Sequence, residues 1–256
     1  MEMMDLNDFN TVFRRELNRI KELPIVGCIT GSCMLDDDFS TWQDKPDIDI
    51  FVYTDTQMVW AISEILSLGY TFGGKGKKKR GEEIKFDWLL DMNSNKSLGL
   101  STIMLEHRIG THDISVNITV KKGCTNVAEV LCSYDMSIIM KGYDIKNKMT
   151  LDLRTQNGWQ ERVASPNLLS NNIEEHPSRF TLARALRQWD RVTKYYNRGY
   201  DTRPMAQYYL DKINEVLAAG AVFGTERDEE SFEEYAKDFK EIREIIKNWL
   251  EVHEDD

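Results

Sequence analysis

The chain has 256 residues, with 33 lysine and arginine side chains against 43 aspartate and glutamate side chains and a formal net charge of −10. A net acidic chain of this length has room for a hydrophobic core but is a poor candidate for indiscriminate coating of nucleic acid. The acidity is concentrated at one end, because residues 225–256 carry 13 acidic and five basic side chains. No stretch approaches 18 consecutive apolar residues, so no membrane span is expected.

Strand and helix patterns alternate over roughly the first 150 residues. Asp5–Leu23 has apolar residues every three or four positions, which predicts an amphipathic helix that Pro24 ends. Thr56–Leu68 predicts a second helix, and Val127–Cys132 a short third one. Short runs rich in apolar and β-branched residues predict strands at Ile25–Thr30, Asp47–Tyr53, Tyr70–Phe72, Ile84–Leu89, Thr102–Arg108, Asp113–Val120 and Met136–Met140.

The pattern changes after Ser165, where three long periodic helices follow one another without a strand. They are predicted at Arg179–Arg198, Met205–Ala219 and Glu229–Glu251. We therefore expect two domains, of which the first is α/β or α+β. Residues 1–165 would form this first domain, and residues 166–256 an all-helical C-terminal domain.

Gly31-Ser32 and the pair Asp47 and Asp49 form the most informative pattern. Gly31-Ser32 follows a predicted buried strand, and Asp47-Ile48-Asp49 opens the next one. Residues i and i+2 of a strand point to the same side, so the two carboxylates share a face. Such a pair repels unless a cation lies between its members, and carboxylates suit Mg²⁺ that also binds substrate phosphates. Gly31 would let a phosphate approach the backbone, and Ser32 would supply a hydroxyl and an amide.

Ile29-Thr30-Gly31-Ser32 followed by Pro46-Asp47-Ile48-Asp49-Ile50-Phe51 resembles the nucleotidyltransferase superfamily with a DNA polymerase β-like palm. The resemblance is strongest to the poly(A) polymerase and CCA-adding branch and to nucleotidyltransferase-like proteins of phages and large DNA viruses. It implies an α+β fold whose palm, a mixed sheet flanked by helices, covers residues 1–165 and places Gly31 and Ser32 at the triphosphate. It also implies that Asp47 and Asp49 hold two Mg²⁺ ions, which clamp an in-line phosphoryl transfer. The gap of fourteen residues between the two motifs is somewhat long for the family.

The resemblance implies a third carboxylate on a neighbouring strand, where it would activate the attacking hydroxyl and complete a metal site. Asp113, at the head of an alternating strand, is the first choice. Asp135 is the second, because Ser133-Tyr134-Asp135 resembles a Ser-Phe-Asp segment of the viral relatives; its alternative role is a cap at a strand start. Those relatives carry Asn or Gln at the position of Asn117. If Asn117 holds the third-carboxylate position, metal chemistry would be altered or lost.

Two basic clusters are candidates for contacts with phosphates. Five cations spaced three and four apart follow one helix face: Arg184, Arg187, Arg191, Lys194 and Arg198. The segment from Pro177 to Arg187 resembles the helix after the palm in CCA-adding enzymes. The resemblance implies contacts with nucleotide or acceptor RNA, and the Gly73–Gly81 loop adds a second group of cations. We assign Arg184 and Arg187 to the nucleotide, and Arg191 and Lys194 with Lys77, Lys78 and Lys79 to the acceptor. A salt-bridged or solvated helix face and a solvated loop tip are the alternatives.

These features predict a Mg²⁺-dependent nucleotidyltransferase that transfers a nucleoside monophosphate from a nucleoside triphosphate to an acceptor hydroxyl and releases pyrophosphate. The expected acceptor is a tRNA-like RNA 3′ end, because of the basic helix face. One alternative is a nucleotidyltransferase-fold protein that binds nucleotide or RNA without catalysis. Another is a toxin- or antitoxin-type nucleotidyltransferase that acts on protein or tRNA.

The expected compartment is the cytoplasm, or the host cytoplasm for a viral protein. Met1–Asp8 has neither the basic nor the apolar region of a signal peptide. The four cysteines lack zinc-type spacing and are expected to be reduced thiols: Cys28, Cys33, Cys124 and Cys132. No membrane partner is expected.

Overall fold

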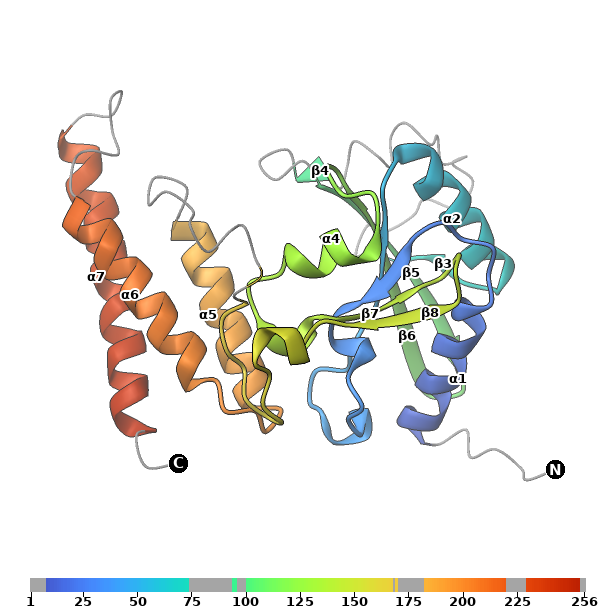
Figure 1. Ribbon diagram of the computed structural model, residues 1–256, viewed down its shortest axis with the longest axis horizontal. Helices are drawn as coiled ribbons and strands as arrows, with labels where there is room; N and C mark the ends of the chain where they lie inside the picture. Colours follow the sequence, from blue (N-terminus) through green and yellow to red (C-terminus); the bar gives the residue numbers. More distant parts are fainter. Residues whose placement is uncertain are drawn as a thin grey trace. The chain divides into compact units, whose positions relative to one another are not determined.

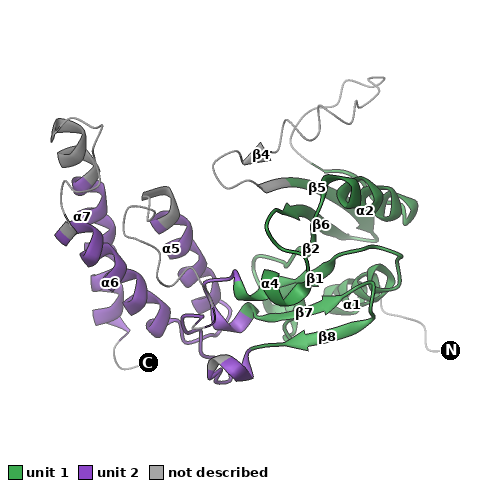
Figure 2. Cartoon of the chain, turned by 45° about the horizontal axis from the view of Figure 1, so that its top comes forward, with its two compact units in different colours: residues 1–132, 139–153 green, residues 133–138, 154–256 purple. Residues whose placement is uncertain are grey.

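The computed structural model describes residues 8–73, 94–95, 100–167, 169, 182–219 and 229–253. The chain divides into two compact units, drawn green and purple in Figure 2. Unit 1 comprises residues 1–132 and 139–153, and unit 2 comprises residues 133–138 and 154–256. Unit 2 therefore starts earlier than the predicted boundary near residue 166, and it includes a short segment from within the predicted first domain. The predicted strand Ile84–Leu89 and the basic Gly73–Gly81 loop, except Gly73, lie outside the described residues.

The described part of unit 1 contains one mixed sheet of eight strands, coloured from blue to yellow-green in Figure 1. Seven strands follow the order β3-β5-β6-β2-β1-β7-β8, and β4 pairs with β5. β2 and β6 run parallel, whereas the other pairs are antiparallel. The strands are β1 Cys28–Thr30, β2 Ile48–Val52, β3 Thr71–Phe72, β4 Ser94–Asn95, β5 Leu100–Ile109, β6 His112–Lys121, β7 Lys141–Asp144 and β8 Met149–Asp152.

The two central strands β2 and β6 have one apolar face and one polar face. Ile48 lies beside Val116, and Ile50 beside Ile118, in the parallel register, and all four side chains are buried. Two helices supply the apolar cover, because α1 (Phe9–Lys21) contacts β6 and α2 (Asp55–Ser67) contacts both strands. Alternate residues of a strand point to opposite faces, so the residues between these apolar ones face away from the helices.

Local capping signals determine where the two helices begin. The carboxylate of Asp8 accepts hydrogen bonds from the amides of Asn10 and Thr11 at the start of α1. Thr54 and Gln57 form a reciprocal capping box at the start of α2. These bonds satisfy amides that have no partner within the helix, and they define where each helix begins. Each helix begins within four residues of its predicted start.

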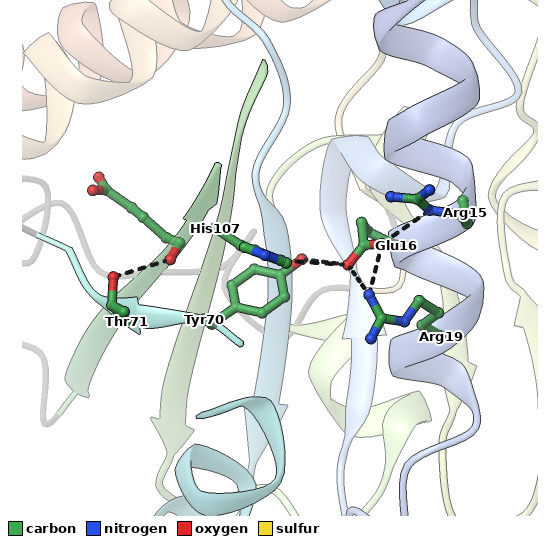
Figure 3. Close-up of polar contacts among 7 residues, drawn as sticks. Arg15, Glu16, Arg19, Tyr70, Thr71 and His107 are labelled. Carbon is green, nitrogen blue, oxygen red and sulfur yellow. Dashed lines mark hydrogen bonds and ion pairs between the residues drawn. The ribbon is translucent and has the colours of Figure 1, made fainter. Parts of the chain in front are cut away.

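Glu16 joins α1 to the sheet through a buried polar cluster, shown in Figure 3. Its side chain is fully buried, and both carboxylate oxygens accept from Arg19 Nη1 at 3.0 Å. Arg15 Nε donates to the same carboxylate at 3.1 Å. On the other side, the Tyr70 hydroxyl donates at 3.4 Å, and His107 Nδ1 of β5 lies 3.8 Å away. The charge of a buried carboxylate is thus compensated by two guanidinium groups.

The described part of unit 2 contains three long helices, in agreement with the predicted helical region. They are α5 Leu182–Tyr196, α6 Arg203–Ala219 and α7 Glu229–Val252, and each contacts the other two. Apolar residues three and four apart form the buried stripe of α7, among them Phe239, Ile242 and Ile246. None of the helices within the described ranges combines the length and the hydropathy that crossing a lipid bilayer requires.

The segment after α4 (Val127–Cys132) departs from the predicted pattern. The predicted strand Met136–Met140 contains a 3₁₀ turn at Ser137–Ile139, although its apolar side chains are buried as expected. A short apolar run satisfies a buried strand and a buried turn equally well, so its composition could not separate them. The hairpin of β7 and β8 was not predicted, because neither strand has a clear apolar alternation.

Candidate functional site

The turn at Gly31-Ser32 lies directly against Asp49. β1 ends at Thr30, and Gly31 opens a 3₁₀ turn that runs to Met34. Gly31 has a φ of +83°, a left-handed conformation that only glycine adopts without strain. A Cβ atom at this position would lie 2.9 Å from Asp49 Oδ2. The glycine therefore allows the turn and the carboxylate to approach each other.

Asp47 and Asp49 are carried by the start of β2, on the face opposite the helices. Asp47 immediately precedes β2, and Asp49 is its second residue. Both are partly exposed, whereas Ile48 between them is fully buried. In the sheet register, Thr30 lies opposite Asp49 on one side and Asn117 opposite Asp49 on the other. The structure thus places Gly31 against Asp49, and it places Asp47 and Asp49 on one face, as the strand alternation predicted for these two carboxylates.

Asn117 connects the two carboxylates. Its side-chain Nδ2 donates to Asp47 Oδ2 at 3.1 Å and to Asp49 Oδ1 at 3.2 Å. Asn117 therefore lies beside the pair, on the parallel neighbouring strand β6. An amide is neutral, so it orients the two carboxylates without cancelling their charge.

Asp113 does not lie beside this pair. It stands opposite Arg108 at the exposed end of the β5–β6 hairpin, with Arg108 Nε 4.0 Å from its Oδ1. Four residues of strand separate it from Asn117, which at about 3.3 Å per residue is roughly 13 Å along β6. Asp113 shares a face with Asn117 because four residues separate them, but the register places it far from Asp49. The assignment of Asp113 as third carboxylate is therefore corrected.

Asp135 belongs to a polar network within unit 2. Arg191 Nη1 donates to Asp135 Oδ1 at 2.5 Å, and the Tyr209 hydroxyl donates to Oδ2 at 3.0 Å. Gln188 Nε2 lies at the limit of hydrogen bonding, 3.5 Å from the same Oδ2. The charge of Asp135 raises the pKa of Arg191 above its usual range, and burial raises that of Tyr209. Asp135 thus joins α5 to α6, and its ion-pair partner Arg191 is a half-exposed side chain.

The other predicted phosphate-binding cations are only partly described. Arg187 and Lys194 are exposed on α5. Arg198 is buried beneath this face, with its guanidinium 5.3 Å from the centre of the Tyr195 ring. The side chain of Arg184, together with Lys77, Lys78 and Lys79, lies outside the described residues.

The residues at Asp47 and Asp49 fit a hard divalent cation. Two carboxylates are ligands that Mg²⁺ accepts, and Mg²⁺ completes its shell with water or phosphate. Among the residues that the structure describes, no group of three or more His, Cys, Asp and Glu side chains is placed to hold a metal ion. Burial, followed by the charge of Asp49, raises the pKa of the nearby Cys33 thiol to about 12, so this thiol stays protonated at neutral pH. None of the four cysteines is in a disulfide.

Comparisons with known proteins leave the family open. No protein-family model matches the chain, and no curated protein matches it. Among solved structures, the crystal structure of JHP933 from Helicobacter pylori is similar at 11% identity, with 99% of this chain and 98% of that chain covered. The TM-score of this pair is 0.28, too low to carry a conclusion about fold or function.

Proposed function

We propose that unit 1 binds a nucleoside triphosphate with Mg²⁺ and transfers its nucleotidyl group to an acceptor hydroxyl. The contact between the Gly31-Ser32 turn and Asp49 carries this proposal. It joins a turn that accepts close approach of a phosphate to a pair of carboxylates suited to the accompanying cation. Either feature alone is common in proteins, but a phosphate subsite and a cation subsite in contact are what a metal-bound triphosphate requires.

Each residue has a distinct part in the proposed reaction. Ser32 and the backbone of the turn would bind the phosphates, and Asp47 and Asp49 would hold the cation, which offsets phosphate charge as the bond breaks. The acceptor oxygen would attack the α-phosphorus, and the bond between that phosphorus and the leaving pyrophosphate would break. An asparagine does not accept a proton at neutral pH, so the hydroxyl proton would pass to water.

The proposed acceptor is an RNA 3′ end. Arg187 and Lys194, seven residues apart on α5, expose cations at helical spacing, which suits contact with a nucleic-acid backbone. The ion pair of Arg191 with Asp135 removes one cation from the predicted stripe. We therefore expect weaker and more local RNA contacts than five aligned cations would give.

The experiment is a transfer assay with labelled ATP, CTP, GTP and UTP, Mg²⁺ and total tRNA. Transfer should be lost in the double variant Asp47→Asn/Asp49→Asn, which keeps the shape of both side chains while removing their charge. Asp113→Asn is the matched control, because it removes a carboxylate from the same face at the hairpin end and should retain wild-type transfer. Transfer that survives the double variant would exclude this site.

Asn117 favours a second candidate, a nucleotide-binding protein without transfer. An amide beside the two carboxylates supplies neither the charge nor the proton acceptor of a third carboxylate. This candidate predicts Mg²⁺-dependent binding of a fluorescent nucleoside triphosphate that the double variant abolishes, with no transfer to any acceptor. Detectable transfer by the wild-type protein, lost in the double variant, would decide for the enzyme.

A further inference from the structure

Asn117 contacts both members of the carboxylate pair. One amide nitrogen donates to both carboxylates, at 3.1 and 3.2 Å, from the neighbouring parallel strand. The group that faces the carboxylates is an N–H donor, which does not ligate a cation, and the side chain of Asn117 has the length of an aspartate. The amide differs from a carboxylate in one respect that matters here, which is charge.

The other candidate carboxylates are not available to this site. Asp113 lies roughly 13 Å along the strand from Asn117 at about 3.3 Å per residue, and Asp135 is held by Arg191 within unit 2. Within the described ranges, no larger group of metal-binding side chains exists. The described site therefore offers two carboxylates, which together balance the charge of a single divalent ion when no nucleotide is present.

We infer that this site binds one divalent cation per chain instead of the two expected from the family resemblance, and that Asn117 sets this limit. In the metal-free protein, the amide keeps the two carboxylates close despite their repulsion. With a cation present, Asp47 and Asp49 supply the charge, and Asn117 acts as a positioning residue that adds none. Replacing the amide by a carboxylate adds the charge that a second ion needs.

The inference rests on the proposed function only in taking Asp47 and Asp49 as cation ligands. The probe is Mn²⁺ alone, with free Mn²⁺ counted by electron paramagnetic resonance during titration of the full chain. The wild-type protein should bind one Mn²⁺ per chain, and Asn117→Asp should bind two. The Asp47→Asn/Asp49→Asn variant should bind none.

The outcomes separate the inference from the proposed function. Two ions on the wild-type protein would overturn the inference and leave the proposed function standing. An unchanged count in Asn117→Asp would also overturn the role of Asn117. No saturable binding by the wild-type protein would overturn both. If Asn117→Asp is unstable without metal, its melting temperature should rise more with Mn²⁺ than that of the wild type, and an equal rise would contradict the inference.

Discussion

Unit 1 holds acidic side chains in two different ways. Glu16 is fully buried between α1 and the sheet, where Arg15 and Arg19 bring two positive charges to it. Asp47 and Asp49 are partly exposed and accept hydrogen bonds from the neutral amide of Asn117. A carboxylate compensated by arginines contributes to the folded structure, whereas a pair oriented by an amide keeps a charge that can act on a cation. The two sites should therefore respond to mutation in opposite ways.

The largest expected effect on stability is at Glu16. Glu16→Ala should lower the free energy of unfolding by about 3 kcal/mol, because it leaves Tyr70 and the two arginines without their shared acceptor. Urea unfolding measures this loss, and cation binding should stay unchanged. Glu22→Ala, which removes an exposed acid at the end of the same helix, should change stability by less than about 0.5 kcal/mol. Equal losses in both variants would contradict the structural role of Glu16.

Asp135 should behave like Glu16 and not like the carboxylate pair. Asp135→Asn removes the charge opposite Arg191 and should cost about 2 kcal/mol of unfolding free energy. Hydrogen exchange should show weaker protection of α5 and α6. Asp190→Asn, at an exposed position of α5, is the control and should have little effect. A variant with wild-type stability but weaker Mn²⁺ binding would instead make Asp135 a metal ligand.

The variant Gly31→Ala tests the contact between the Gly31-Ser32 turn and Asp49. Gly31→Ala should cost about 1 kcal/mol for its left-handed backbone. It should also weaken Mn²⁺ binding several-fold, because the new methyl group displaces Asp49. Gly123→Ala is the matched control, since Gly123 has a φ of +86° with no atom within 4 Å of the added Cβ. It should lose similar stability and keep wild-type cation binding. Loss of Mn²⁺ binding in both variants would show that it results from general destabilisation and not from the contact with Asp49.

The smallest expected effect is a pH dependence at Cys33. Burial raises the pKa of its thiol from 9.0 to about 12, so the folded state keeps the proton that the unfolded state releases above pH 9. This contribution to stability is complete below pH 9 and is lost as the pH rises towards 12. From pH 8 to 9.5, the wild-type protein should lose about 1 kcal/mol more than Cys33→Ala. Identical pH profiles in urea unfolding would contradict a buried thiol beside Asp49.

The helices could be predicted because their signals are local. The cap at Asp8, the capping box at Thr54 and the apolar stripe of α7 all lie within the segments that they shape. Met136–Met140 was predicted wrongly as a strand, because burial of an apolar run does not define its backbone conformation.

The site could be predicted on β1 and β2 but not on β6. Gly31-Ser32 and the Asp47–Asp49 alternation belong to consecutive segments, so their spacing indicated their proximity. Which residue of β6 lies beside Asp49, Asp113 or Asn117, depended on the register between β6 and β2. The two strands are more than 50 residues apart in the chain. Alternation defines the face of a strand residue but not its height in the sheet, which the parallel register alone provides.

The path of the chain between the two units has a consequence for synthesis and recombination. β1 pairs on one side with β2 and on the other with β7, which follows it by more than 100 residues, after the chain has contributed residues 133–138 to unit 2. A nascent chain must therefore leave one edge of β1 unpaired until residue 144 has emerged, and such an edge invites aggregation. Residues 133–138 of unit 2 lie between the two segments of unit 1, so a single genetic crossover within residues 1–256 would divide at least one unit between two parent sequences. The two units are therefore expected to be inherited together.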